Sequence, residues 1–361
     1  MKTLTLGLVG VGRIGQMHAR NLLTVRDRMA ERNVQLEVVI ADADAQLGRQ
    51  VATDLGFKAA EDLDGLLASG IDALIITTNA ATHPEVIRAG LKAGIPMFCE
   101  KPVSSDVIDA LPLLREIEAS GGIVQIGHQR RFDAGYVEAK KRYDAGELGW
   151  LHGLRAISGD AFSPAIDYLA TSGGLFRDMA VHDFDIIRWL TGKEIVEIYA
   201  KGSNNGDPDI GAVGDVDTSS AVLTLADGTI ATATATRYNG AGHDVRLDVQ
   251  GSKDSVVVGL DEKAAFSSAE ANIAFPAGTP HPTFAERFAE AYVSELVAFV
   301  ELVLGERENP CTPFEAVSAS LVADAAQLSL VRNQPVQIPS LRDILDGTAE
   351  PLDAVQLQPT A

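Results

Sequence analysis

The chain has 361 residues, of which 46% are apolar and 22% are charged. It is therefore long enough for about two domains of roughly 150 residues each and too apolar for wholesale disorder. Acidic residues outnumber basic ones by 50 to 30, giving a formal net charge of −20, which makes nucleic acids and anionic membrane surfaces unfavourable partners.

The first third of the chain alternates short apolar runs, rich in β-branched residues, with segments of helical spacing. Buried strands alternating with helices are typical of a doubly wound parallel sheet, so residues 1–127 are expected to form a Rossmann domain. Strands are predicted over residues 4–9, 36–41, 71–77, 95–99 and 123–126, and helices from about residue 13 and over residues 85–93 and 107–119.

A glycine motif, GVGRIG, lies between the first predicted strand and helix. Gly10 permits a tight turn, Gly12 allows a pyrophosphate to approach the backbone, and Gly15 lets helix and strand pack closely. The helix N-terminus offers N–H groups and a partial positive charge to the anion. A glycine-rich turn without a ligand is the alternative. The predicted phosphate-binding loop comprises Gly10, Gly12, Arg13, Ile14 and Gly15.

Asp42 follows the second predicted strand, where a ribose-binding acid belongs, although it lies further from Gly15 than the usual ~20 residues. A carboxylate here would bind the ribose diol and repel a 2′-phosphate, which favours NAD over NADP. A solvated loop acid, as we expect for Asp44, is the alternative.

Glu100, Lys101 and Pro102 directly follow the predicted strand 95–99, at the strand end where doubly wound sheets bind ligands. Pro102 biases Lys101 away from helical geometry and could start the next helix. Lys101 is therefore expected to point into the crevice, although a lysine before proline is more commonly a surface residue.

The pattern changes after residue 127, and a run of strands predicts a mostly antiparallel open sheet in an α+β domain. Asp227–Gly228 is a hairpin signal between two of these strands. Residues 128–340 are expected to form this domain for substrate binding and oligomerisation, with an irregular tail from Pro335 and a C-terminal segment at 341–361. Helices are predicted over residues 134–145, 176–190, 284–304 and 314–330, and strands over 151–158, 216–225, 229–238, 245–250 and 255–258.

The predicted helix 176–190 carries Asp178, His182 and Asp185, whose spacings place them on one helical stripe. The rest of the helix is largely apolar, and burying such groups is costly unless they are paired or functional. A structural Asp–His pair is one alternative. Zinc is another, but no His-Glu-x-x-His motif or third histidine lies nearby, so no metal is expected.

Together with GVGRIG, the runs TTNAATHPE and CEKP resemble the glucose–fructose oxidoreductase, inositol dehydrogenase and rhizopine-catabolism (Gfo/Idh/MocA) family. The resemblance continues through GHQRRFDAGY and GGLFRDMAVHDFD to TATRYNG, which covers nearly the whole chain. It is greatest for inositol 2-dehydrogenases. It implies that Thr78, Asn79 and His83 lie along the cofactor, with Thr78 replacing the usual proline, and that Lys101 contacts nicotinamide and substrate.

The resemblance implies NAD-dependent oxidation of a secondary hydroxyl on a cyclic polyol or sugar to the ketone. His182 would act as general base because its reference pKa lies near neutrality. Asp178 would orient the imidazole, and Lys101 would hydrogen-bond the reacting oxygen. The resemblance also suggests substrate contacts for Arg130, Asp185 and Tyr238.

Several rival functions remain open at this point. An aldose or keto-glycoside could be the substrate, or tightly held NAD could serve a redox-neutral glycosidase. An NAD-responsive regulator is the non-enzymatic rival. Retention of Lys101, Asp178 and His182, with no basic DNA-binding segment, argues against a regulator. The resemblance also predicts a homo-oligomer, a tetramer rather than a dimer, in which the open sheet face carrying Ala221, Leu223, Leu225 and Ile230 is covered.

The two cysteines, Cys99 and Cys311, exclude a disulfide framework and have no partners at metal-ligand spacing. Cys99 ends an apolar run and is expected to be a core thiol. No apolar stretch is expected to span a bilayer, and the N-terminal run lacks a signal-peptide cleavage site. We therefore expect a protein of the reducing cytoplasm.

Overall fold

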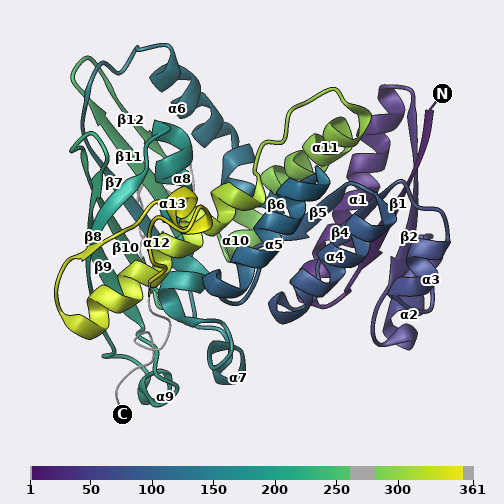
Figure 1. Cartoon of the computed structure of the whole chain (residues 1–361), viewed down its shortest axis with the longest axis horizontal. Helices are drawn as coiled ribbons and strands as arrows, with labels where there is room; N and C mark the ends of the chain where they lie inside the picture. The colour runs from purple at the N-terminus through teal and green to yellow at the C-terminus, as the bar shows by residue number, and fades with distance from the viewer. Residues whose placement is uncertain (1, 261–280, 353–361) are drawn as a thin grey trace, which may run out of the picture. The chain divides into compact units, whose positions relative to one another are not determined.

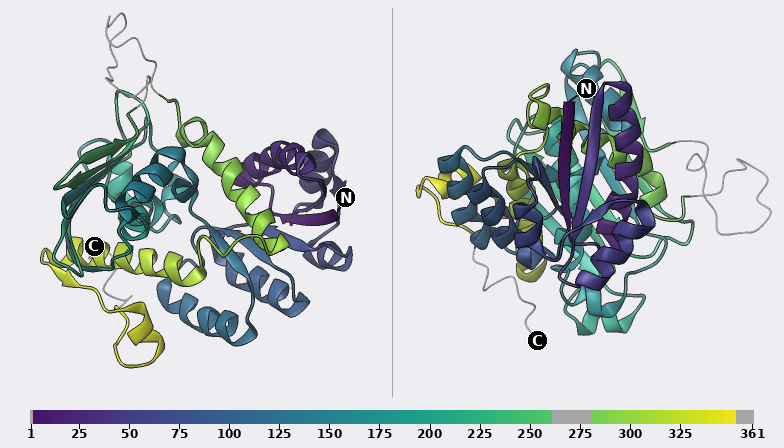
Figure 2. Two further views of the ribbon diagram at one scale, coloured as in Figure 1. Left: turned by 90° about the horizontal axis from the view of Figure 1, so that it is seen from above. Right: turned by 90° about the vertical axis from the view of Figure 1, so that its right-hand side faces the viewer.

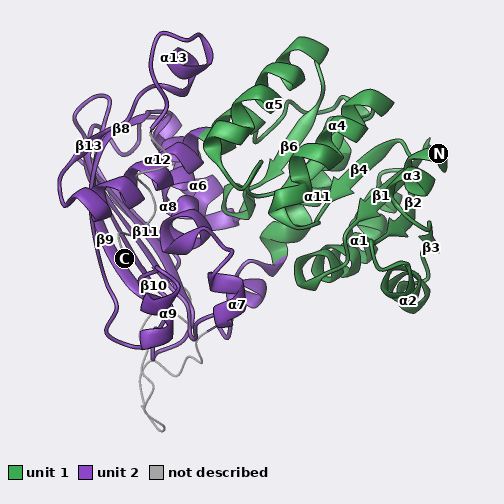
Figure 3. Cartoon of the chain, turned by 60° about the horizontal axis from the view of Figure 1, so that its bottom comes forward, with its two compact units in different colours: residues 1–132, 290–317 green, residues 133–289, 318–361 purple. Residues whose placement is uncertain are grey.

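The computed structural model describes residues 2–260 and 281–352, which divide into two compact units (Figure 3). Unit 1 comprises residues 1–132 and 290–317, and unit 2 comprises residues 133–289 and 318–361. The sequence suggested contiguous domains divided at residue 127. The structure differs mainly in returning residues 290–317 to unit 1, because the apolar helix in this segment packs into the core of that unit.

The sheet of unit 1 is wholly parallel, with strand order β3-β2-β1-β4-β5-β6 (Figure 1). This is the order of a doubly wound dinucleotide-binding sheet, and it confirms the predicted Rossmann fold. Because the strands are parallel, their carboxyl ends share one edge of the sheet. The strands are β1 (Lys2–Val9), β2 (Val34–Ala41), β3 (Lys58–Ala59), β4 (Ala73–Ile76), β5 (Met97–Glu100) and β6 (Val124–Gly127).

Polar side chains determine where several helices of unit 1 begin. Asp44, Asp62 and Asp106 each accept hydrogen bonds from N–H groups of the following turn, which caps α2, α3 and α5. Pro102 therefore does not start the next helix as predicted, since the cap at Asp106 delays it. The helical segments are α1 (Arg13–Glu31), α2 (Ala45–Leu55), α3 (Leu63–Ala68), η1 (Ala80–Thr82), α4 (His83–Ala93), α5 (Val107–Ser120) and η2 (Gln129–Phe132).

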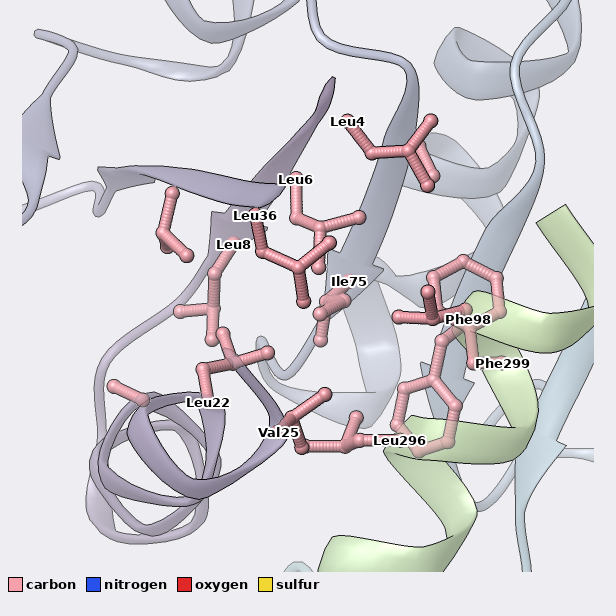
Figure 4. Close-up of a cluster of buried hydrophobic side chains, with 14 of the residues drawn as sticks. Leu4, Leu6, Leu8, Leu22, Val25, Leu36, Ile75, Phe98, Leu296 and Phe299 are labelled. Atoms are coloured by element: carbon pink, nitrogen blue, oxygen red, sulfur yellow. The ribbon is translucent and has the colours of Figure 1, made fainter. Parts of the chain in front are cut away.

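The core of unit 1 is closed by α11 (Ala289–Leu304), far along the sequence (Figure 4). Leu296 and Phe299 of α11 are fully buried and join the same apolar cluster as Val25 of α1 and Phe98 of β5. The rings of Phe98 and Phe299 lie 6.0 Å apart between centroids. Burying a side chain of this size contributes about 1.5–3 kcal/mol, so α11 is an integral part of this core.

Unit 2 is built on a seven-stranded sheet of order β12-β11-β7-β10-β9-β8-β13. The predicted hairpin at Asp227–Gly228 joins β9 and β10, and Gly228 has a φ of 86°. Beyond this hairpin the strands do not pair in chain order, because β7 lies between β10 and β11 and pairs parallel with β10. The predicted mostly antiparallel sheet is confirmed. The strands are β7 (Leu151–Gly159), β8 (Ile195–Ser203), β9 (Thr218–Leu225), β10 (Ile230–Thr236), β11 (Asp244–Gly251), β12 (Ser255–Val258) and β13 (Val336–Gln337).

Helices α6, α8 and α12 lie on one face of this sheet (Figure 2). The predicted helix 176–190 is divided between a π-helical turn and α8, and the predicted helix 284–304 is divided between α10 and α11. The helical segments are α6 (Ala134–Asp144), α7 (Ile166–Leu169), the π-helical turn η3 (Phe176–Ala180), α8 (Val181–Thr191), α9 (Pro208–Ala212), α10 (Phe284–Arg287), α12 (Pro313–Arg332) and α13 (Leu341–Leu345).

The open face of the sheet does not carry the apolar residues that the sequence analysis assigned to it, with the exception of Ile230. Ala221, Leu223 and Leu225 are buried, so these side chains belong to the core and not to an exposed patch. The sequence alternation was right, but it could not tell which face the helices cover. The other face exposes Val222 and Ile230, at 49% and 55% of their surface.

Helix α12 is long and apolar enough to meet the length and composition criteria for a membrane span, contrary to the expectation that no stretch would. Its most apolar window has a mean hydropathy of 1.3 and is 67% buried inside the protein. Asp324 in this helix also forms an ion pair with Arg177. These features are those of a core helix.

The segment that follows was expected to be irregular. Instead, β13 pairs with β8, and α13 buries Leu341, Ile344 and Leu345. Residues 353–361 of the predicted tail lie outside the described residues.

Candidate active site

The glycine motif forms the turn between β1 and α1, and each glycine meets a different constraint. Gly10 has a φ of 90°, a conformation that L side chains rarely adopt. A Cβ on Gly15 would lie 1.9 Å from the Gly10 carbonyl oxygen, so only glycine allows this packing. A Cβ on Gly12 would meet nothing within 4 Å, which leaves open space beside the backbone.

This open space fits a dinucleotide. Gly12 is the N-cap of the 19-residue helix α1 and provides no side-chain cap, so the first N–H groups remain available to an anion. Arg13, exposed, and Ile14, half-buried, are the first residues of the helix. The loop therefore suits the pyrophosphate of NAD, as the sequence suggested.

Asp42 lies beside this loop, just beyond β2. Its Oδ2 accepts a hydrogen bond from the Val11 N–H at 2.6 Å, and its Oδ1 accepts one from the Asp44 N–H at 2.8 Å. Both bonds hold the half-buried carboxylate in place while each oxygen keeps further acceptor capacity. Asp44 is exposed as expected, and it also caps α2.

The residues after β4 serve mainly to shape the same edge of the sheet. Asn79 is exposed, and its side chain accepts from the Ala81 N–H. His83 is fully buried: its Nδ1 lies 2.6 Å from the Pro102 carbonyl oxygen and its Nε2 lies 3.2 Å from that of Thr78. Burial lowers the pKa of His83. It therefore links two loops of this edge, a role that the sequence did not reveal.

Glu100 and Lys101 lie at the carboxyl end of β5, two strands from β1 in the sheet order. Glu100 Oε1 is 2.6 Å from His18 Nε2, and its Oε2 accepts from the Lys101 N–H at 3.1 Å. Lys101 is half-buried, and the peptide bond to Pro102 is cis. The predicted lysine thus lies at the edge that carries the dinucleotide loop.

Arg130 lies in η2, beyond the end of β6 and thus at the same sheet edge. It is almost fully buried, as is its neighbour Arg131. Arg131 donates to the Pro310 carbonyl oxygen at 2.9 Å and to Glu315 Oε1 at 3.0 Å. Arg131 is therefore committed to the fold of unit 1, while Arg130 remains the predicted substrate contact.

Unit 2 contributes the second group of predicted residues. Asp178 lies in the π-helical turn η3, whereas His182 and Asp185 lie in α8. The predicted continuous α-helix is wrong at this point, because Asp178 lies in a π-helical turn and the α-helix begins only at Val181. Such turns occur frequently at functional sites. That Asp178, His182 and Asp185 share one stripe stays a prediction. His182 is half-buried, and Asp185 is almost completely buried.

Asp178 is held by two residues that sequence reasoning missed. Its Oδ1 accepts a hydrogen bond from the Tyr168 hydroxyl at 2.8 Å, and its Oδ2 lies 3.3 Å from Arg237 Nη1. Arg237 is 0% exposed and also donates from Nη2 to Asp215 at 2.8 Å. The buried guanidinium of Arg237 therefore binds two carboxylates, and its positive charge stabilises the ionised form of Asp178.

The motif TATRYNG contains a residue, Arg237, that the sequence did not single out. Tyr238, the predicted substrate contact, follows β10 and is 42% exposed. Its neighbour Arg237 is the residue that the structure buries beside Asp178. Sequence adjacency to Tyr238 was the only signal for Arg237.

The predicted residues therefore fall into two groups. One lies at the carboxyl edge of the unit 1 sheet, and the other lies around η3 and α8 of unit 2. The convergence of Lys101 with Asp178 and His182 stays a prediction.

Comparison with protein families gives two matches. A family model described as "Oxidoreductase family, NAD-binding Rossmann fold" matches residues 4–128, and one described as "GFO/IDH/MocA C-terminal domain" matches residues 136–257. Together they span most of both units. They agree with the dinucleotide loop in unit 1 and with the sheet of unit 2.

Individual relatives match over most of their length. The myo-inositol 2-dehydrogenase of Thermotoga maritima is 32% identical over 92% of this chain and 98% of its own. The scyllo-inositol 2-dehydrogenase (NAD(+)) of Bacillus subtilis is 32% identical over 92% of this chain and 95% of its own.

Among solved structures, scyllo-inositol dehydrogenase from Lactobacillus casei, with bound NAD(H) and scyllo-inositol, has a TM-score of 0.80. It is 31% identical and covers 93% of this chain and 99% of its own.

Proposed function

The chain belongs to the Gfo/Idh/MocA family of NAD-binding oxidoreductases, and from this premise we propose that it oxidises a secondary hydroxyl of an inositol or related cyclic polyol to the ketone. The observation that carries the proposal is the position of Lys101 at the same sheet edge as the dinucleotide loop. Full-length relatives named as inositol dehydrogenases support the substrate class.

The proposed chemistry assigns one task to each side chain. NAD, when bound, supplies the acceptor for the hydride that leaves the carbinol carbon. His182 takes the hydroxyl proton as general base and returns it in the reverse reaction. Lys101 donates a hydrogen bond to the reacting oxygen and stabilises negative charge that develops there. Asp178, held by Tyr168 and Arg237, orients the imidazole and stabilises its charged form.

Three further residues are proposed to bind the other hydroxyls of the substrate. Arg130 would act from unit 1, and Asp185 and Tyr238 from unit 2. A polyol ring presents several hydroxyls, and each bound hydroxyl strengthens discrimination against analogues that lack it.

The test is a substrate screen with purified protein. NAD and a panel of inositols, aldoses and keto-glycosides are supplied, and NADH formation is followed by absorbance. We expect steady NADH production with an inositol. Faster turnover of an aldose or keto-glycoside would reassign the substrate. NAD binding without net NADH would indicate a redox-neutral glycosidase if a glycoside is cleaved and a regulator if nothing is turned over.

Replacing Asp42 with alanine should weaken NAD binding and relax the exclusion of NADP. In this proposal the carboxylate binds the ribose diol, and it would repel a 2′-phosphate by about 4 kcal/mol per charge pair at close range. The measurement is kcat/KM with each cofactor. Asp44→Ala, which alters a neighbouring exposed acid, should leave the cofactor ratio unchanged. A wild-type preference for NADP would contradict the assignment.

A homo-oligomer is also proposed, with a tetramer favoured over a dimer. The open face of the unit 2 sheet carries a cross-strand row that begins at Val222 and ends at Val257, both nearly half exposed. Val222 and Ile230 are diagonal neighbours on β9 and β10, whereas Thr232, Arg155 and Asp248 separate Val222 from Val257, so the face that a second copy would cover is part apolar and part polar. Light scattering at micromolar concentration should give a multiple of 38.2 kDa. Ile230→Lys should lower the mass, and a monomeric wild type would overturn the proposal.

A further inference from the structure

Three ionisable side chains of unit 1 lie together in one cluster. They are His18 of α1, Glu100 of β5 and Glu295 of α11. Their potential ligand atoms all lie within 4.8 Å of one another. The rings of Phe98 and Tyr292 flank His18 at centroid distances of 5.5 and 5.8 Å. No residue of this cluster other than Glu100 was singled out from the sequence.

Within the cluster, Glu100 has the contacts of an ionised carboxylate. It accepts hydrogen bonds from His18 Nε2 and from the Lys101 N–H. Burial opposes its ionisation, but the bond from His18 and the nearby positive groups outweigh it, so its pKa is lowered. Gly127 leaves room for this carboxylate, since a Cβ there would lie 3.3 Å from Glu100 Oε2.

Glu295 has the opposite surroundings. It is 0% exposed, and no donor group among the described residues reaches either carboxyl oxygen, whereas the Glu100 carboxylate, an acceptor, lies within 4.8 Å. Burial, followed by the charge of Glu100, raises the pKa of Glu295 well above its ordinary value. An ionised carboxylate without donors is costly to bury, and two close carboxylates resist joint ionisation. The geometry therefore favours a proton on Glu295.

A bound cation would explain the cluster less well. Ligand atoms around a metal such as zinc lie about 2.0–2.2 Å from the ion and therefore roughly 3 Å or more from each other. The 2.6 Å separation of His18 Nε2 and Glu100 Oε1 is instead that of a direct hydrogen bond.

We propose that Glu295 is a positioning residue: its uncharged carboxyl donates to the Glu100 carboxylate and thereby fixes the main chain that presents Lys101. The consequence for catalysis rests on the proposed function, whereas the protonation of Glu295 does not. The link is short, since Glu100 Oε2 accepts directly from the Lys101 N–H. Glu295 touches neither reacting atoms nor cofactor in this role.

The other titratable and charged groups facing the cluster come from α1, the end of β5, α4, η2 and α11. They are Arg13, Cys99, Lys101, His83, Arg130 and Tyr292.

The first arm of the test measures thermal stability against pH. The native state holds a proton on Glu295 that the unfolded chain releases above pH ~4.3. Wild-type stability therefore falls as the pH rises from there toward the raised native pKa. Glu295→Gln carries no proton to lose. The Tm of Glu295→Gln minus the Tm of wild type should therefore increase between about pH 5 and about pH 8, by roughly 2–4 °C or more.

The control for this arm is Glu61→Gln, which alters an exposed acid of the same unit. Its Tm difference from wild type should stay flat over the same range. A flat or falling difference for Glu295→Gln would show an ionised Glu295 and overturn the proposal. So would a stoichiometric metal ion in the purified protein, because the three side chains would then be its ligands.

The second arm monitors the conformation of the Lys101 main chain by NMR and does not require an active enzyme. In protein labelled with ¹⁵N-lysine, the Lys101 amide signal should move in Glu295→Leu, which is neutral but cannot donate to Glu100. It should stay close to the wild-type position in Glu295→Gln. An unmoved Lys101 signal in Glu295→Leu would overturn the positioning role even if the first arm shows a protonated Glu295.

Activity gives the third reading. Glu295→Leu should lower kcat about 10-fold or more through misplacement of Lys101, with NAD affinity unchanged, and Glu295→Gln should restore kcat to within about 2-fold of wild type. If wild type turns over no polyol, the proposed function fails, but the first two arms still decide the role of Glu295. If wild type is active and Glu295→Leu keeps full kcat, the positioning role fails alone.

Discussion

Replacing His182 with alanine should lower kcat by about 10²–10⁴-fold, the usual loss when a positioned acid–base group is removed. The residue is half-buried in α8, two residues after the end of the π-helical turn that carries Asp178. NAD binding should survive, because the loop at Gly12 and the carboxylate of Asp42 lie in unit 1 and remain intact. Steady-state kinetics and a fluorescence titration with NAD measure the two effects separately.

An exposed histidine of unit 2 provides a matched control. His152 lies in β7, and His152→Ala should keep nearly full kcat. Asp178→Asn should be milder than His182→Ala if Asp178 only orients the base. If His182→Ala turns over at nearly the wild-type rate, α8 is structural and the proposed mechanism is wrong, even with the fold and cofactor right.

The second large effect is expected for Lys101→Ala, again about 10²–10⁴-fold in kcat. Loss of the ammonium removes the donor to the reacting oxygen, where negative charge develops. NAD affinity should also fall somewhat, since we expect this side chain to contact the nicotinamide. Single-turnover kinetics with a substrate deuterated at the carbinol carbon would show whether hydride transfer has become limiting.

Lys92 serves as the comparison for this variant. It is an exposed lysine in the last turn of α4, and Lys92→Ala should leave kcat and NAD affinity unchanged. An isotope effect that stays at its wild-type value in a slow Lys101→Ala variant would place the defect outside hydride transfer. In that case, Lys101 would not be assigned to stabilisation of the reacting oxygen.

The parallel sheet and its loop were predictable because their determinants are local. Gly10 and Gly15 satisfy steric constraints within one turn, and Asp42 follows its strand directly. The apolar runs of the strands have a periodicity that needs no knowledge of distant residues. The structure confirms the fold that these features predicted, and the candidate cofactor residues of unit 1 lie at one edge of its sheet.

The remaining features depend on partners far apart in the sequence. Arg237 lies 59 residues from Asp178, and Glu295 is separated from His18 by most of the chain. No window of sequence reports that a guanidinium or a carboxyl will be enclosed by such partners. The π-helical turn is likewise invisible to a rule that assumes 3.6 residues per turn, which is why residues 176–190 were predicted as one continuous α-helix.

The return of α11 to unit 1 also has a consequence for the order of events during synthesis. The strands of unit 1 leave the ribosome first, but the core residues Leu296 and Phe299 follow only after the strands of unit 2 up to β12. Until then, the apolar surface around Phe98 lacks its covering helix. Incomplete cores of this kind are prone to aggregation and are protected by chaperones. The nascent chain therefore carries an unfinished nucleotide-binding unit through most of its translation.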